Sequence, residues 1–284
     1  MMTPALVALG MASIAAAGFS SPGDPGPFQF EVTQVRVPFG RAGMAAIFYR
    51  PLVPESVPGS RPVVIFGHGF LGAARRYGVI YRHLAAHGFY VLAPQYPDPI
   101  FGRPNSLPTD GMFATIEFLD SLSRIPGNRL DPRRVGLVGH SMGGGAAFLA
   151  ARRDRLGRVK AIAGLSPWGP ANTTAESLRI PTLVIAAEND GSTPVENVRR
   201  EFFDPAPGPC YFLLIRNGGH NGYLDHTCWI EDRFEKFDRV SQLRAVRTYL
   251  AAFLGFYLES DVRYGPWLFG AELARDTTVS FERK

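Results

Sequence analysis

Ser141 is the residue whose surroundings most clearly predict chemistry. It is the third residue of Gly-His-Ser-Met-Gly, residues 139–143, which matches the pattern GxSxG. An apolar run, residues 135–138, precedes the pattern, and a segment rich in glycine and alanine, residues 143–153, follows it. A strand, a tight turn and a helix in this order expose a serine hydroxyl at the end of a sheet, and the two glycines avoid collisions within the turn. We therefore predict that Ser141 is a nucleophile.

Asp190 and His220 follow later apolar runs, in the order that such a serine requires. Asp190 lies in Glu-Asn-Asp-Gly after residues 182–187, and His220 lies in Asn-Gly-Gly-His after residues 211–215. In hydrolases with this strand–serine–helix turn, the acid and then the histidine follow the serine along the chain. We expect His220 to accept the proton of Ser141 and Asp190 to hold the tautomer of His220.

Four other residues compete with these positions or flank them. Glu188 is the alternative acid, and His226, which lies further along the histidine loop, is the alternative base. His68 and His140 lie beside the expected oxyanion donors, and we interpret both as packing residues behind the site.

The negative oxygen of an acyl-transfer intermediate needs two N–H donors that are already in place. One is expected from Met142, the residue after the nucleophile, where the start of a helix also favours negative charge. The other is expected after the third strand, where Gly-His-Gly-Phe, residues 67–70, supplies the N–H of Phe70.

Strands and helices are expected to alternate along the chain and so to position these residues. Such alternation predicts an α/β fold of the α/β-hydrolase type, with a mostly parallel central sheet covered by helices on both faces and an antiparallel hairpin at its start. Residues 166–181 are too few for a helical cap, so we expect no lid domain. Strands are expected over residues 28–37, 44–49, 62–66, 89–93, 135–138, 159–165, 182–187 and 211–215, and helices over residues 77–87, 110–122, 143–153, 195–203 and 240–258.

The first residues read as a targeting segment. Residues 5–18 are apolar and rich in alanine, but they are too few to span a bilayer. We predict a signal peptide over residues 1–18, and hence secretion to the periplasm or the outside of the cell. The absence of Lys and Arg before the run leaves an ordinary N-terminal helix open. Residues 19–27 are expected to form a flexible leader and residues 28–284 a single catalytic domain.

Composition narrows the function further. The 284 residues are 46% hydrophobic and 19% charged, which excludes a largely disordered chain and a coiled coil. The net charge of +5 is spread thinly, with no basic run longer than two, so we expect no nucleic-acid partner. The sequence has no Cys/His cluster with the spacing of a metal site, so we predict no bound metal, and we expect no cofactor. Cys210 and Cys228 either form one disulfide or are unrelated buried thiols.

From about Gly26 to Phe269 the sequence resembles the bacterial cutinase-like polyester hydrolases, which include the poly(ethylene terephthalate) hydrolases. Dienelactone-hydrolase and chlorophyllase relatives share some of these motifs but fit the Pro-Trp pair less well. The motifs that carry the resemblance are GPFQF near the start, LAAHGF at 84–89, GHSMGGG at 139–145, SPW at 166–168, IPTLVIAAENDGSTPV at 180–195, NGGH at 217–220 and DVRY at 261–264.

The resemblance implies a monomeric serine carboxylic-ester hydrolase that cleaves esters or polyesters through an acyl-enzyme, without a cofactor. A small-molecule carboxylesterase or lipase, or a dienelactone-hydrolase-like enzyme, is the alternative on the same fold. Trp168 would be a substrate-side aromatic that faces the ring of Phe70 across an open groove, although packing in the core stays open for Trp168. The implied triad is Ser141, Asp190 and His220, and the implied oxyanion donors are Phe70 and Met142.

Three departures from the family pattern bear on substrate choice. Phe269 stands where many relatives carry a cysteine, so that family disulfide is not expected. Residues 95–108 are unlike the family pattern and are expected to reshape one side of the groove. Residues 221–225, which follow the histidine, are also particular to this chain.

Overall fold

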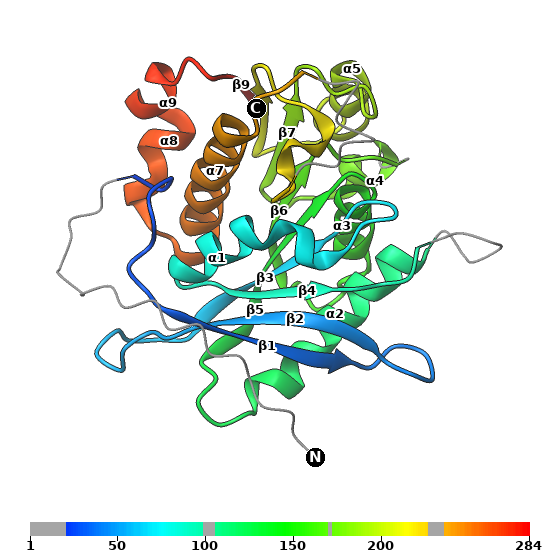
Figure 1. The fold of residues 1–284 in the computed structure, drawn as a ribbon, viewed down its shortest axis with the longest axis vertical. Coiled ribbons are helices and arrows are strands. Elements are labelled where there is room, and N and C mark those ends of the chain that lie inside the picture. The colour runs from blue at the N-terminus through cyan, green and yellow to red at the C-terminus, as the bar shows by residue number, and fades with distance from the viewer. Residues whose placement is uncertain (1–20, 99–105, 170–171, 227–235) are drawn as a thin grey trace.

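One nine-stranded sheet organises the part of the chain that the structure, a computed structural model, describes: residues 21–98, 106–169, 172–226 and 236–284. The strand order is β1-β2-β4-β3-β5-β6-β7-β8-β9 (Figure 1). The strands are β1 (Phe30–Val37), β2 (Met44–Pro51), β3 (Arg61–Gly67), β4 (Tyr90–Pro94), β5 (Leu130–His140), β6 (Val159–Leu165), β7 (Thr182–Ala187), β8 (Cys210–Ile215) and β9 (Val279–Arg283).

Most of the sheet is parallel. The neighbours from β4 through β3, β5, β6 and β7 to β8 all pair in parallel. The hairpin of β1 and β2 joins antiparallel to β4. These pairings confirm the predicted fold class, including the opening hairpin. β9, which pairs antiparallel with β8 at the other edge, was not predicted.

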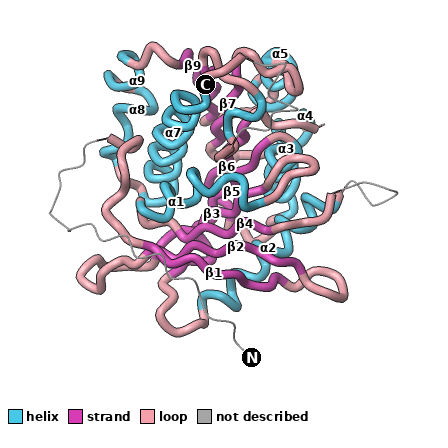
Figure 2. Tube along the Cα trace, viewed as in Figure 1, coloured by secondary structure: helices cyan, strands magenta, loops and turns pink. Residues whose placement is uncertain are grey.

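Helices cover both faces of the sheet (Figures 1 and 2). α1 and α7 pack into one buried cluster, whereas α2, α3 and the π-helical turn η2 pack into the other. The helices and helical turns are η1 (Ala74–Tyr77), α1 (Gly78–Ala86), α2 (Leu107–Ser123), α3 (Met142–Arg153), α4 (Asn172–Ser177), α5 (Val195–Val198), η2 (Arg199–Phe203), η3 (His220–Tyr223), α7 (Arg239–Glu259), η4 (Val262–Tyr264), α8 (Gly265–Phe269) and α9 (Ala271–Arg275).

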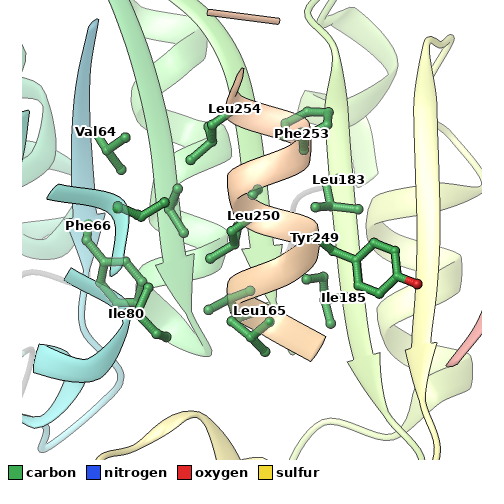
Figure 3. Packing of buried hydrophobic residues seen from close by; sticks show 14 of the residues in the cluster. Val64, Phe66, Ile80, Leu165, Leu183, Ile185, Tyr249, Leu250, Phe253 and Leu254 are labelled. Carbon is green, nitrogen blue, oxygen red and sulfur yellow. The ribbon is translucent and has the colours of Figure 1, made fainter. Parts of the chain in front are cut away.

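The continuous apolar run in β3 shows why its sequence carries no alternation. Val64 and Phe66 belong to the cluster under α1 and α7, whereas Val63 and Ile65 belong to the cluster under α2 and α3. Successive side chains of a strand point to opposite faces, so a strand covered on both faces is apolar at every position. Figure 3 shows Leu250 and Leu254 of α7 on the face of the sheet that carries Val64 and Phe66.

Residues 21–27, which belong to the stretch 19–27 predicted as a flexible leader, contact α1. The buried Nε2–H of His83 donates to the carbonyl of Pro22 at 2.8 Å, and Nε2–H of His87 donates to Asp24 at 3.0 Å. A Cβ at Gly26 would collide with the backbone of Ala86. Close approach to the helix therefore holds this segment, although its Pro and Gly content favoured a loose one.

The structure bears on the prediction that no cap domain is present, but not on the predicted signal peptide. Between β6 and β7 the described residues form only the short helix α4, so they contain no helical cap there. The predicted signal peptide, residues 1–18, lies outside the described residues. Among the described helices, none combines the length and the apolar character needed to cross a bilayer.

His83 is expected to make folding sensitive to acid. Burial, and then the neighbouring His87, lower the pKa of His83 from 6.5 to about 3. Below pH 6.5 His83 is therefore protonated in the unfolded chain, whereas in the folded chain it stays neutral down to about pH 3. The free energy of unfolding falls as the pH falls through this window, because protons favour the unfolded state. Between pH 7 and 5 this group alone costs about 2 kcal/mol of unfolding free energy.

The measurement is urea unfolding at pH 7 and pH 5. His83→Gln keeps an N–H donor for Pro22 and should reduce the pH-dependent loss by about 2 kcal/mol. His226→Gln is the matched control, because His226 is exposed, and it should leave the loss unchanged. Equal losses in the wild type and His83→Gln would contradict this account.

Candidate active site

Ser141 occupies a strained turn between β5 and α3. Its backbone has φ 54° and ψ −123°, a conformation that costs a residue with a Cβ of order 1–3 kcal/mol. The turn is too tight for side chains on either side. A Cβ at Gly139 would collide with the carbonyl of Gly143, and a Cβ at Gly143 would collide with the carbonyl of Gly67 at the end of β3. These contacts explain both glycines of the GxSxG pattern.

The structure brings the three predicted reacting residues into one hydrogen-bonded chain. Nε2 of His220 lies 3.1 Å from Oγ of Ser141, and Nδ1 of His220 lies 2.9 Å from Oδ2 of Asp190. A carboxylate can only accept, so Nδ1 carries the ring proton and Nε2 is free to accept the hydroxyl proton. The three residues follow β5, β7 and β8, whose carboxyl ends meet at one edge of the parallel sheet.

Asp190 stays ionised although it is buried. Burial opposes the charge, but hydrogen bonds from His220 and Thr193 outweigh it and lower the pKa of Asp190. The backbone N–H groups of Ser192 and Thr193 donate to Oδ1 at 2.9 and 2.7 Å. Oγ1 of Thr193 donates to Oδ2 at 2.7 Å. Donors on both carboxylate oxygens fix the direction in which the acid faces His220.

The competing residues lie elsewhere. Glu188 is exposed and accepts a hydrogen bond from the N–H of Asn217, and His226 is exposed. His68 contacts the carbonyl of Gly69 through Nδ1 at 2.9 Å. His140 contacts the hydroxyl of Tyr77 through Nδ1 at 2.9 Å. Burial lowers the pKa of both His68 and His140 and keeps them neutral.

The two predicted oxyanion donors are free to bind a ligand. The N–H of Met142 is the first of α3 and has no partner within the helix, as at every helix start. The N–H of Phe70 makes no hydrogen bond within the described residues. Both residues line the same groove as Ser141.

This groove has a volume of about 1950 Å³. The side chain of Phe70 is 51% exposed and that of Trp168 is 58% exposed, so Trp168 is not a core residue. The N–H of Trp168 donates to the carbonyl of Ser141 at 2.9 Å, which fixes its backbone beside the nucleophile. Substrate contact by the two rings stays a prediction.

Beyond Ser141 the groove continues between α2 and α3. Each helix lines it with residues three or four positions apart, as one helix face does. The lining is apolar near Ser141 and carries charges of both signs toward the end of α3. The lining residues here include Thr109, Phe113, Ile116, Glu117 and Asp120 of α2, Ala146, Leu149, Arg152 and Arg153 of α3, and Asp154, Arg155, Leu156 and Arg158 beyond it.

The segment after β4 contacts the loop that carries Phe70, and its expected effect on the shape of the groove stays a prediction. Oε1 of Gln95 accepts from the N–H of Ala74 at 2.8 Å, and its Nε2 lies 3.1 Å from Nε2 of His68. Oδ1 of Asp98 accepts from the N–H of Leu71 at 2.7 Å. Residues 99–105 lie outside the described residues.

Sequence reasoning missed three residues that contact the site. Thr193 binds both Asp190 and, at 3.3 Å, Nδ1 of His220. Tyr77 and Gln242 bind the backbone of Gly69 and Gly219, the residues that precede Phe70 and His220. Thr193 could have been found from its place three residues after the acid, whereas no local pattern marks the other two.

The cysteine and metal predictions have limited outcomes. Cys210 is a free, buried thiol whose pKa burial raises to about 12. Its expected partner, Cys228, lies outside the described residues. The residues that the structure describes contain no group of His, Cys, Asp and Glu side chains that could hold a metal ion.

Comparison with known proteins places the whole site within one matched region. A family model described as PET hydrolase-like matches residues 16–284. Cutinase est1 of Thermobifida alba is 27% identical over 70% of this chain, which spans 62% of that protein. Cutinase 2 of Thermobifida cellulosilytica is 31% identical over 72% of this chain and 71% of its own length. A bis(hydroxyethyl) terephthalate hydrolase of Streptomyces coelicolor is 24% identical over 86% of this chain and 75% of the length of that protein.

The hydrogen bond between Asp190 and His220 predicts how Ser141 reacts with a fluorophosphonate probe. Asp190→Asn should slow the labelling of Ser141 about 10³–10⁴-fold, because the ring of His220 then takes the wrong tautomer. Glu188→Gln is the matched control in the same loop and should label at the wild-type rate. Rates are read from gel fluorescence against time. The opposite pattern would assign the acid to Glu188.

Proposed function

The chain belongs to the PET hydrolase-like family, and on this premise we propose that it is a serine carboxylic-ester hydrolase of the cutinase type that accepts polyesters. The family membership confirms the resemblance inferred from the sequence motifs. The hydrogen-bonded chain from Ser141 through His220 to Asp190 is the observation that carries the proposal.

The reaction proceeds in two halves. Oγ of Ser141 attacks the ester carbonyl while Nε2 of His220 takes the hydroxyl proton. The tetrahedral intermediate collapses as His220 returns that proton to the leaving alcohol, and the acyl group stays on Ser141. A water molecule then gives a proton to His220 and attacks the acyl carbon. His220 then returns this proton to Oγ of Ser141 as the bond between Oγ and the acyl carbon breaks, so the acid is released and the serine is regenerated.

Fixed charges and dipoles lower the barriers of both steps. The carboxylate of Asp190 stabilises the imidazolium that forms on His220, and its four hydrogen bonds keep it charged. The N–H groups of Phe70 and Met142 bind the developing oxyanion. Neither oxyanion donor has to break an existing hydrogen bond within the described residues before it binds the intermediate.

The shape of the groove supports a polymeric substrate. Phe70 and Trp168 each expose about half of a large ring, and such rings contribute binding energy to planar or aliphatic acyl units. The continuation between α2 and α3 leaves room for a chain longer than one ester unit. A small-molecule carboxylesterase with the same residues is the alternative, since ester cleavage itself does not need the outer groove.

We also propose that the protein is secreted. Residues 5–18 have the length and composition of a signal-peptide core. An insoluble polyester cannot enter a cell, so its hydrolase has to meet it outside.

Hydrolysis of p-nitrophenyl butyrate and clearing of an emulsified aliphatic polyester, measured in parallel, test the proposal. We expect both activities in the wild type and a loss of at least about 10⁴-fold in Ser141→Ala. Activity that survives in Ser141→Ala would refute the assigned nucleophile.

Aromatic variants separate the polyesterase from the alternative. Phe70→Ala and Trp168→Ala should reduce polyester clearing about tenfold, while hydrolysis of the soluble ester falls much less. Phe269→Ala removes an aromatic that is 44% exposed outside the groove, and should change neither activity. Hydrolysis of the soluble ester alone by the wild type would favour the small-molecule carboxylesterase.

A further inference from the structure

Two glycines each lie directly before a residue that takes part in the proposed reaction. Gly69 precedes Phe70, the proposed oxyanion donor, and Gly219 precedes His220, the proposed base. The backbone of each glycine is bound by a buried polar side chain from a neighbouring element. Tyr77 of η1 binds Gly69, and Gln242 of α7 binds Gly219.

Tyr77 is 1% exposed and uses its hydroxyl in two directions. The N–H of Gly69 donates to the hydroxyl oxygen at 3.1 Å, and the oxygen lies 2.9 Å from Nδ1 of His140. In either tautomer of His140 the hydroxyl oxygen has a lone pair that accepts from the N–H of Gly69. Burial lowers the pKa of His140 and keeps its ring neutral.

Gln242 is also 1% exposed and binds both sides of one residue. Its Oε1 accepts from the N–H of Gly219 at 2.9 Å, and its Nε2 donates to the carbonyl of Gly219 at 2.9 Å. The loop leaves no room for another side chain there, because a Cβ at Gly222 would collide with the amide of Gln242. Two bonds from one planar amide fix the position and the direction of the backbone that enters His220.

We propose that Tyr77 and Gln242 are positioning residues, Tyr77 for the N–H of Phe70 and Gln242 for the ring of His220. The inference rests on the proposed function, since it concerns the same reaction. Misplacement of a reacting group by about 1 Å costs on the order of 10²-fold in rate, so small shifts of the backbone at Gly69 and Gly219 are enough to slow the reaction. The two residues act at different steps: Tyr77 at oxyanion binding and Gln242 at proton transfer.

Tyr77→Phe removes one oxygen and keeps the ring. We expect kcat for the soluble ester to fall about tenfold while KM changes less than twofold. The affinity for a boronic acid, whose tetrahedral adduct places an oxygen in the oxyanion hole, should fall by the same factor as kcat, because both report transition-state binding. Unchanged kcat and unchanged boronate affinity in the folded variant would overturn the role of Tyr77.

Gln242→Met keeps the volume and removes both hydrogen bonds. We expect kcat and the rate of Ser141 labelling by a fluorophosphonate to fall together about tenfold, with KM again within twofold. Wild-type values of both rates would overturn the role of Gln242. Should this variant fail to fold, Gln242→Glu gives the same test, because its carboxylate keeps the acceptor for the N–H of Gly219 and loses the donor to its carbonyl.

Thr115→Val is the control for lost stability alone. Thr115 is fully buried in α2, and its hydroxyl donates to the carbonyl of Gly111 at 2.8 Å, away from both loops. This variant should unfold at lower urea concentration, yet keep kcat, boronate affinity and labelling rate. A tenfold loss of kcat in Thr115→Val would show that destabilisation alone explains the other variants and would overturn the inference. A wild-type chain that neither hydrolyses esters nor labels would instead refute the proposed function itself.

Discussion

The close approach of α3 to the ends of β3 and β5 is the constraint on which the rest of the site depends. Gly139, Gly143 and Gly67 meet backbone to backbone, and no side chain fits between them. This contact forces Ser141 into its positive φ and leaves its hydroxyl at the sheet edge. It also places the first N–H of α3 beside the loop after β3, so the nucleophile and the two proposed oxyanion donors come from one packing event.

Around this turn, burial and charge are distributed unequally among the ionisable groups. Asp190 stays charged, because hydrogen bonds from His220 and from the loop after β7 outweigh the cost of burying it. His68 and His140 lie nearby but are neutral, because burial penalises the charged form of a histidine. The ring centroids of His140 and His220 are 4.7 Å apart. A permanent positive charge on His140 would therefore oppose the imidazolium that the proposed reaction forms on His220.

The sequence predicted what local patterns determine. β6 and β7 have the predicted bounds, because short, mainly apolar runs between turn residues favour strands covered on both faces. Turn residues after β7 and β8 marked Asp190 and His220 as candidates. β9 was not predicted, because Val279–Arg283 has a short, mixed pattern that becomes a strand only by pairing with the edge of β8. The packing of residues 21–27 was not predicted for a similar reason, since it depends on contacts with α1. The contacts of Tyr77 and Gln242 were not predicted, because their partners lie on other elements and only the folded chain brings them together.

Phe70 has two proposed roles, one for its backbone and one for its ring. Its N–H is the proposed oxyanion donor, whereas its half-exposed ring lies in the groove where a substrate would bind. Rotation of the peptide between Gly69 and Phe70 would therefore move both at once. The N–H of Gly69, one peptide earlier, donates to the buried hydroxyl of Tyr77, and this bond limits how far the backbone that leads into Phe70 can turn. The outer groove has no such link to the N–H of Phe70, so its residues can vary without moving the proposed oxyanion donor.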